Sequence, residues 1–267
     1  MGTLAGRPLL FWRAGAEWRA VAALPIETSP GPVTAAAEAG GARAEATLAV
    51  VEPGFSSRSL TLARRYVEEP VDPKIRRRIA LDRSAFDRAW GQPPAPPRFL
   101  GGFGWPRTSQ VTGRFGDQRV LNGKKESVHY GLDLNGPRGA PVVAAADGEV
   151  VLARNAYYSG KTVVLWHGAG VFTLYFHLDR IGVRPGAQVR RGERIGLLGA
   201  TGRATGPHLH WSAKVGGLYV DPESLLGIDF AAGTAPPRRR REPPAPEAPA
   251  GDAKPPEEPP PPPQLRR

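Results

Sequence analysis

Cysteine is absent from the 267-residue chain. Disulfide bonds and thiolate metal sites are therefore excluded, and a bound metal must take its ligands from histidine, aspartate or glutamate. Histidine itself is scarce, with five in the whole sequence. The chain also lacks an apolar run of about 18 residues, the length that a membrane-spanning helix needs. The few histidines are consequently the positions that carry most information about function.

The N-terminus lacks the pattern of a secretory signal. Residues 1–12 read MGTLAGRPLLFW, and only a short apolar run separates Arg7 from Arg13, where a signal would have a basic start and a long apolar stretch. The sequence therefore indicates either a cytoplasmic protein or one whose signal is missing here. The formal net charge of +11 favours contact with polyanions such as nucleic acid, acidic wall polymers or lipid headgroups, although an arginine-rich composition alone gives the same number.

The first half of the chain predicts a small β-unit followed by a helix. Residues 1–70 contain short alternating runs between turns such as SPGP and AGG, which is typical of a small N-terminal β-sandwich. Residues 71–97 predict a short linking helix and a proline-rich linker, GQPPAPP. Asp72 is the expected N-cap and Pro73 the first-turn residue. The apolar stripe of this helix comprises Ile75, Ile79, Phe86 and Trp90.

The second half predicts an all-β domain and a tail. Residues 98–230 consist of strand and turn patterns, with turns expected at the Asp-Gly step of PVVAAADGEVVLA, around Gly168 and Gly170, and at Gly216-Gly217. No helical periodicity of useful length interrupts them, so a β-barrel-like fold is expected there. Residues 231–267 are rich in proline and charge, which predicts a disordered tail.

Two of the five histidines stand in the stretch GPHLHW, at His208 and His210. In a strand, alternate side chains share a face, so both imidazoles point to one side while Leu209 points into the opposite layer. A lone histidine in a strand is usually satisfied by an ordinary hydrogen bond. Two histidines on one face instead favour one metal ligand and one catalytic base.

The stretch HYGLD supplies the remaining polar groups of the predicted site. His129, Gly131 and Asp133 share one face if the segment is a strand, and Gly131 and the following Asn-Gly-Pro turn favour a strand over a helix. The missing side chain at Gly131 leaves room between its neighbours. His129, Asp133 and His210 then form a set of two histidines and one carboxylate.

Such a set is suited to hydrolytic zinc. Three protein ligands leave a fourth position for water, whose pKa the metal lowers towards about 7. A neighbouring neutral histidine can accept the proton of that water, and His208 is placed for this role. His177, in LYFHL, is the candidate to donate to the developing oxyanion or to share the role of the base.

The three stretches HYGLD, LYFHL and GPHLHW occur in an order and spacing that resemble the LytM/lysostaphin-type zinc endopeptidases, which cleave peptidoglycan peptides. The resemblance covers about residues 98–228. It places the zinc ligands on His129, Asp133 and His210 and the catalytic histidines on His177 and His208. His167, in VLWHGAG, matches a family position without an assigned catalytic role, and we interpret it as structural.

One feature of the lysostaphin-like branch is missing. That branch has a tyrosine shortly before the first zinc histidine, where this sequence reads NGKKES. The segment TGRFGDQRVLNG is instead similar to the Gram-negative branch, which also has an N-terminal accessory domain. The resemblance therefore implies peptidoglycan peptides as substrate, zinc as cofactor, and a periplasmic or cell-envelope location without a transmembrane segment. It also implies envelope protein partners for the N-terminal domain or the tail.

Three alternatives remain at this stage. Some relatives have lost zinc ligands and act as activators of other wall hydrolases, and an N-terminal domain that covers the groove would make an autoinhibited enzyme. Nucleic-acid binding is suggested by RRRR at 238–241 and IRRR at 75–78, but aromatic residues do not alternate with these runs, so no nucleic-acid partner is expected. A biotinyl or lipoyl carrier hairpin over VRPGAQVRRGERIGLLG would need a lysine at its turn, and none is there.

Overall fold

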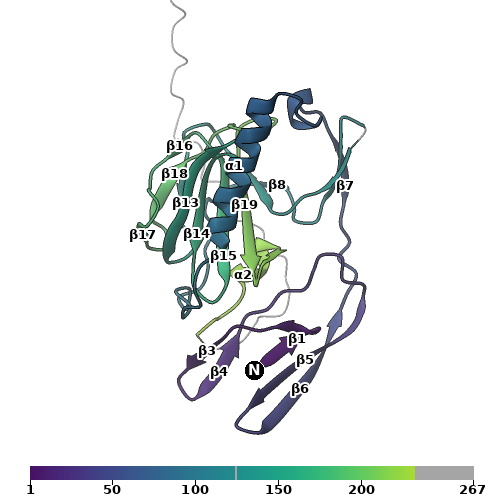
Figure 1. The fold of residues 1–267 in the computed structure, drawn as a ribbon, viewed down its shortest axis with the longest axis vertical. Helices are drawn as coiled ribbons and strands as arrows, with labels where there is room; N and C mark the ends of the chain where they lie inside the picture. The colour runs from purple at the N-terminus through teal and green to yellow at the C-terminus, as the bar shows by residue number, and fades with distance from the viewer. Residues whose placement is uncertain (124, 232–267) are drawn as a thin grey trace, which may run out of the picture.

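A computed structural model describes residues 1–123 and 125–231 (Figure 1). Strands dominate these residues, so the predicted all-β class is confirmed. The predicted disordered tail lies outside the described residues except for its first residue, Ala231. Within the described ranges, no helix is both long and apolar enough to cross a membrane.

The largest sheet forms the centre of the C-terminal half. Its strands are antiparallel in the order β17-β13-β14-β15-β19-β11-β8, and β20 pairs with β19 at one end. The strands are β8 (Val111–Gly113), β11 (Leu132–Asn135), β13 (Gly148–Ala156), β14 (Gly160–Trp166), β15 (Val171–Leu178), β17 (Gln188–Val189), β19 (His208–Val215) and β20 (Leu218–Val220). A smaller sheet has the order β12-β18-β16. It contains β12 (Pro141–Val143), β16 (Arg180–Ile181) and β18 (Arg194–Leu197).

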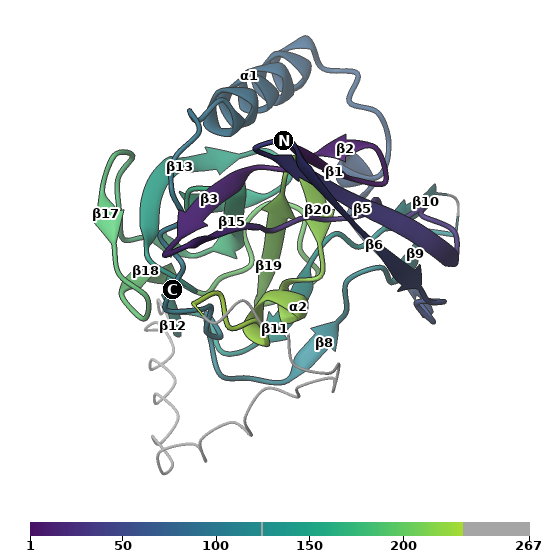
Figure 2. The same cartoon turned by 90° about the horizontal axis from the view of Figure 1, so that it is seen from below.

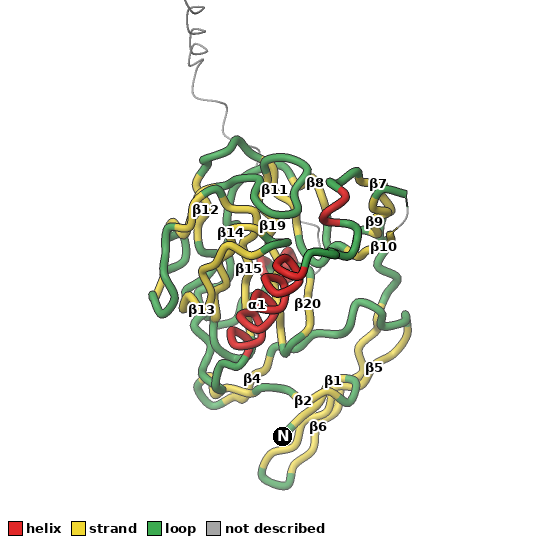
Figure 3. The backbone as a smooth tube through the Cα atoms, turned by 45° about the horizontal axis from the view of Figure 1, so that its top comes forward, coloured by secondary structure: helices red, strands yellow, loops and turns green. Residues whose placement is uncertain are grey.

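Two apolar layers cover the two faces of the large sheet. One face packs against the small sheet around fully buried side chains that include Leu209, Trp211 and Ile195. The other face packs, in part, against helix α1 (Pro73–Trp90), which contributes Ala85 and Ala89. The helix lies along β13 in the ribbon (Figure 3). His208 and His210 alternate with Leu209 and therefore lie on the face of the sheet that α1 partly covers.

Helix α1 begins as predicted, because the Asp72 side chain accepts a hydrogen bond from the Lys74 backbone and Pro73 occupies the first turn. The predicted large apolar residues are only half-buried, however, and the fully buried residues of the helix are Asp82, Ala85 and Ala89. The Asp82 carboxylate accepts hydrogen bonds from Arg154 Nε at 2.5 Å and from the Tyr157 backbone at 2.8 Å. This buried, paired carboxylate fixes the helix on the sheet.

The first 50 residues form a four-stranded sheet and a separate hairpin. The sheet has the order β2-β1-β5-β6, and β3 pairs with β4. Their bounds are β1 (Gly2–Leu4), β2 (Arg7–Pro8), β3 (Phe11–Ala14), β4 (Glu17–Ala20), β5 (Gly31–Ala39) and β6 (Ala42–Val50). The long β5–β6 hairpin lies below the C-terminal half in Figure 1 and in front of it in Figure 2, where the molecule is seen from below. The four-stranded sheet and the hairpin contain few buried side chains. One of them, Trp12, packs on the C-terminal core against Phe99.

A segment from the predicted N-terminal unit joins the C-terminal half. Strand β7 (Ser57–Leu60) pairs in parallel with β9 (Gln118–Leu121), which also pairs with β10 (Lys125–Val128). A 3-10 helix, η1 (Arg64–Tyr66), follows where a strand is predicted. The predicted division between residues 1–70 and 98–230 stays a prediction. The pairing of β7 with β9 means that residues 57–60 share a sheet with the second of these units.

Two of the predicted turns are confirmed and one is wrong. Gly168 and Gly170 adopt positive φ angles in the β14–β15 turn, and Gly216 and Gly217 do so between β19 and β20. The Asp147-Gly148 step does not make a hairpin, because β12 pairs with β18 rather than with β13. A second helix, α2 (Pro222–Leu226), interrupts the range that was predicted to contain strands alone.

His167 lies in this core, with Nδ1 2.7 Å from the Asp147 carbonyl and Nε2 2.7 Å from Thr173 Oγ1. Burial lowers its pKa to about 4, whereas the unfolded chain has the ordinary value of about 6.5. The folded state therefore binds fewer protons between these values. Acidification from pH 7 to 4 should cost about 3 kcal/mol of stability through this residue.

His167→Gln should thus lose less stability on acidification than the wild-type protein. Urea unfolding at several pH values, with chelator present so that metal loss does not contribute, measures the difference. Parallel pH profiles for the two proteins would contradict this assignment.

Candidate active site

The register between β11 and β19 brings two predicted ligands together. Asp133 pairs directly with His210, and Asn135 with His208. Directly opposed residues of an antiparallel pair project from the same face with their Cβ atoms about 5 Å apart. The carboxylate and the imidazole therefore start within reach of one another. His208 lies one step further along the same face, as the alternation of HLH predicts.

His129 reaches the same point from outside the sheet. The predicted continuous strand over residues 129–133 is wrong, since β10 ends at Val128 and β11 begins at Leu132. The break is at Gly131, where an added Cβ would lie 2.5 Å from Ser212 Oγ and 2.8 Å from His210 Nε2. The chain passes too close to β19 for any side chain there. The expectation that Gly131 leaves room between its neighbours is wrong, because atoms of β19 fill that space.

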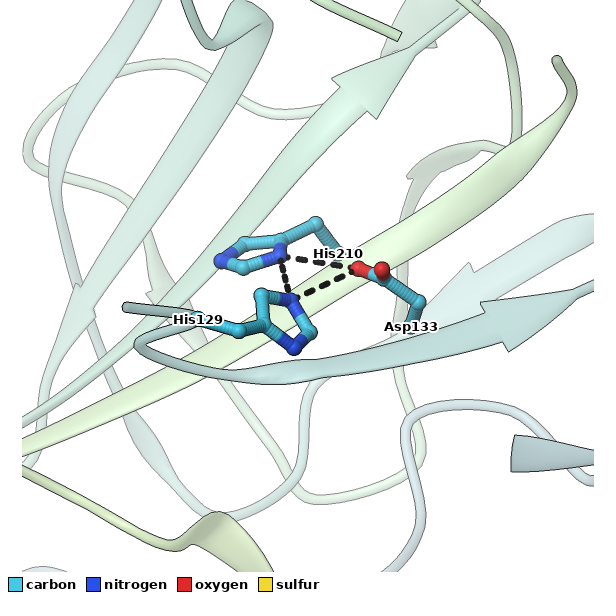
Figure 4. A group of neighbouring side chains, drawn as sticks. All are labelled: His129, Asp133 and His210. Carbon is cyan, nitrogen blue, oxygen red and sulfur yellow. Dashed lines mark hydrogen bonds and ion pairs between the residues drawn. The ribbon is translucent and has the colours of Figure 1, made fainter. Parts of the chain in front are cut away.

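Three ligand atoms converge on one point (Figure 4). His129 Nε2 lies 3.0 Å from Asp133 Oδ1 and 2.9 Å from His210 Nδ1, and the last two atoms are 2.9 Å apart. Ligands at 2.0–2.1 Å from a tetrahedral zinc ion are about 3.3 Å apart. The three atoms are within a few tenths of an ångström of that arrangement, and a small outward shift of the side chains completes it.

Hydrogen bonds on the outer side of each ring select the tautomer that a metal requires. His129 Nδ1 donates to the Arg114 carbonyl at 2.7 Å. The Ser212 hydroxyl donates to the Tyr130 carbonyl, so it accepts from His210 Nε2 at 2.8 Å. Both inner nitrogens are then lone-pair acceptors that face the Asp133 carboxylate. Three acceptors pointing at one another need a cation between them, so the donor set fits zinc.

Arg119 holds the carboxylate from the other side. Its Nη2 donates to Asp133 Oδ2 at 2.6 Å, which leaves Oδ1 for the metal. An added Cβ at Gly113 would lie 2.7 Å from Asp133 Oδ2 and 2.8 Å from Arg119 Nη2, so only glycine leaves space for this pair. The positive charge of the Arg119 guanidinium favours the charged form of Asp133. The carboxylate is therefore ionised at neutral pH.

The two predicted catalytic histidines lie beside the ligand set. His208 Nδ1 donates to the Gly206 carbonyl at 2.9 Å, and His208 Nε2 faces Asp133 Oδ1 at 3.7 Å. The ring of His177 lies 4.9 Å from that of His208. His177 Nδ1 donates to the Thr201 carbonyl at 2.8 Å. Each ring thus keeps a free Nε2 lone pair.

A β-bulge turns His177 towards the site. Lys161 pairs with Leu178 and Val163 with Tyr175, so Phe176 and His177 together oppose the single residue Thr162. Regular alternation would point His177 away from the face that Phe176 shares with His210. The left-handed backbone of His177, with φ at 60°, returns its ring to that face at a cost of about 1–3 kcal/mol.

His177 and His210 are neutral at physiological pH. Burial, together with the neighbouring His208 and His210, lowers the pKa of His177 to about 3. Burial also lowers the pKa of His210 to about 4, although Asp133 acts in the opposite direction. A neutral His210 is the form that binds a metal, and a neutral His177 has an acceptor nitrogen in the site.

Several supporting groups were not predicted from the sequence. They are Arg114, Arg119, Thr201, Gly206 and Ser212, whose side chains or carbonyls hold the residues above. Ser212 follows His210 at the same two-residue interval that separates the two histidines, so alternation alone would have placed it on their face. The carbonyl partners belong to loops, and no side-chain pattern marks them.

Ser212→Ala should weaken zinc binding by about ten- to a hundredfold, because His210 loses the acceptor that fixes its ring and tautomer. Competition with a chromogenic chelator measures the affinity. Ser84→Ala, which removes an exposed hydroxyl from α1, is the matched control and should bind zinc as the wild type does. Equal affinities for the two variants, with unchanged far-UV circular dichroism, would contradict this role of Ser212.

Comparisons with known proteins agree with the site. Residues 127–222 match the family described as Peptidase family M23. A solved structure of an M23 peptidase from Pseudomonas aeruginosa is 30% identical, covers 87% of this chain and 88% of its own, and superposes with a TM-score of 0.63. Peptidoglycan DD-endopeptidase ShyA of Vibrio cholerae is 49% identical over 94 residues, which are 35% of this chain and 22% of that protein.

A second curated relative extends further along the chain. Peptidoglycan DD-endopeptidase ShyB of Vibrio cholerae is 39% identical over 142 residues, or 53% of this chain and 29% of that protein. The chain thus spans 22% to 29% of the length of these two relatives. The match to the Pseudomonas aeruginosa structure, in contrast, extends over most of both chains. The resemblance inferred from the three histidine motifs is confirmed, and the chain belongs to peptidase family M23.

Proposed function

We propose that this protein is a zinc-dependent endopeptidase that hydrolyses the peptide crosslinks or stem peptides of peptidoglycan. The observation that carries the proposal is the division of labour among four histidine rings at one point. His129 and His210 direct lone pairs at Asp133. His208 and His177 each keep a free lone pair beside that set, and their ring centres are 4.9 Å apart.

The residues divide the hydrolysis between binding and proton transfer. His129, Asp133 and His210 would hold zinc, which would polarise a carbonyl as a Lewis acid and lower the pKa of an attacking water. His208 accepts the proton of that water at Nε2, because its Nδ1 proton is held by Gly206. The same nitrogen then returns the proton to the leaving amine. His177 shares this transfer or, once protonated, donates to the developing oxyanion.

The substrate class rests on the similarity to named relatives. ShyA and ShyB are both named peptidoglycan DD-endopeptidases, and both match within the part of this chain that contains the site. We infer that this chain acts on the same polymer and therefore works in the periplasm or cell envelope. Protein partners in the envelope are proposed for the N-terminal strands, which have extensive exposed surface.

The ligand set also bears on the alternative of a non-enzymatic activator. Activators of this type lack one or more ligands, whereas His129, Asp133 and His210 are all present and converge here. The enzyme is therefore favoured over the activator. An autoinhibited enzyme remains compatible with the same site and differs from an open one only in what covers the groove.

His210→Ala should remove zinc and activity together, because a ligand is lost. His208→Ala should retain zinc and lose turnover by about a hundred- to ten-thousandfold, the usual contribution of a general base. Metal content by mass spectrometry and cleavage rate are measured on the same samples. Full activity in both variants would place the chemistry elsewhere.

The function itself is tested with purified crosslinked muropeptides, whose products are separated by mass spectrometry. We expect cleavage that a chelator abolishes and added zinc restores. Absence of cleavage by the zinc-loaded chain would overturn the proposal for the chain as it stands. Addition of the full zinc-loaded chain to a second, separately purified peptidoglycan hydrolase would then distinguish an activator, which raises the rate of that hydrolase, from an autoinhibited enzyme, which leaves it unchanged.

A further inference from the structure

The loop between β18 and β19, residues 198–207, accepts hydrogen bonds from both proposed catalytic histidines. Its Thr201 carbonyl accepts the His177 Nδ1 proton, and its Gly206 carbonyl accepts the His208 Nδ1 proton. Gly202 lies between them with φ at 73°, and an added Cβ there would be 2.3 Å from the Gly160 nitrogen. The loop is therefore pressed against the β13–β14 turn, and its side chains have fixed starting points beside the histidines.

Arg203 stands in this loop between the two carbonyls. Its backbone nitrogen donates to the Tyr158 carbonyl at 2.7 Å, and its guanidinium lies over the Tyr158 ring at 5.4 Å. The side chain is half-buried. Among the described residues no carboxylate lies within ion-pair distance of it. A guanidinium that is partly removed from water and lacks a carboxylate is unfavourable unless a ligand supplies one.

Arg119 is a second guanidinium at the site. Burial lowers the pKa of Arg203, and the positive charge of Arg119 lowers it further, while Tyr158 acts in the opposite direction. Arg119 binds the carboxylate of the proposed metal ligand Asp133. The buried Arg119 Nε has no hydrogen-bond partner in the described part of the chain. The ion-pair partner of Arg119 is Asp133.

The surrounding rim is also basic. Arg65 lies over the Tyr66 ring at 4.9 Å and Arg78 over the Tyr157 ring at 5.9 Å. The rings of Tyr66 and Tyr157 contact the ring of Tyr158, over which the Arg203 guanidinium lies. Arginines therefore stack on each of the three tyrosines of this cluster. A rim of this composition favours an anionic substrate over a neutral one.

We propose that Arg203 binds a carboxylate of the substrate peptide close to the scissile bond. The fork of a guanidinium matches a carboxylate in two parallel hydrogen bonds. This inference rests on the proposed endopeptidase function and adds the chemical feature that selects the peptide. Arg203 is thus a specificity residue, whereas Thr201 and Gly206 in the same loop position the catalytic histidines.

The test compares a synthetic crosslinked stem peptide that has free carboxylates with its counterpart in which they are carboxamides. For the zinc-loaded full chain, kcat/KM should be about ten- to a hundredfold higher for the acid. Arg203→Gln should remove that preference through KM, with kcat and zinc content unchanged. Arg203→Lys should restore part of it. Arg184→Gln is the matched control, because Arg184 is exposed and lies in the β16–β17 turn, at the opposite end of the sheet from β11.

Equal rates of the wild-type protein on the acid and the carboxamide peptide would overturn the inference. An equal loss of kcat on both peptides in Arg203→Gln would also overturn it, because Arg203 would then support the loop structure. Binding separates this failure from that of the proposed function. Both peptides are titrated calorimetrically into the zinc-loaded chain carrying His208→Ala, with and without Arg203→Gln. Arg203-dependent preference for the acid without cleavage by the wild type would support the carboxylate site and reject the endopeptidase. Equal binding of acid and amide would reject the site.

Discussion

The site depends on the register of one strand pair, β11 with β19. Leu132, Leu134, Leu209 and Trp211 are fully buried on the core side of these two strands. Because side chains alternate, burying these four residues forces Asp133 and His210 onto the opposite face and directly across from one another. A slip of one residue would put the ligands into the core and the core residues onto the opposite face of the sheet. The apolar core therefore specifies the metal site from the opposite face of the sheet.

Around this register, the other functional groups are held from outside the sheet by polar contacts. Carbonyl oxygens of Arg114, Thr201 and Gly206 each accept the outer proton of one histidine ring. His210 uses a hydroxyl instead. In every case the partner fixes which nitrogen faces the centre. Ring orientation and tautomer are thus set before metal or substrate binds, which is the main requirement for precise proton transfer.

The distinction between side-chain faces and backbone partners explains what the sequence could predict. Alternation in HLH and the short apolar strands report side-chain faces, so the all-β class, the ligand set and the β14–β15 and β19–β20 turns follow from them. Partners that are backbone carbonyls leave no such pattern. The bulge at His177 is hidden for the same reason, since it consists of a left-handed backbone in a residue other than glycine. The strand expected through His129 failed because a glycine was read as a site of open space, whereas it marks contact with β19.

Residues near the predicted domain boundary reach the site through one buried carboxylate. Asp117 accepts hydrogen bonds from Ser56 Oγ at 2.6 Å and from the Arg114 backbone at 3.0 Å. Its carbonyl accepts from the His129 backbone at 2.9 Å. The segment that leads into β7 therefore supports the loop that carries the Arg114 carbonyl and the first metal ligand. An accessory unit that only covered a finished site would not need these contacts. The segment around Ser56 is better understood as part of the scaffold that holds His129 in place.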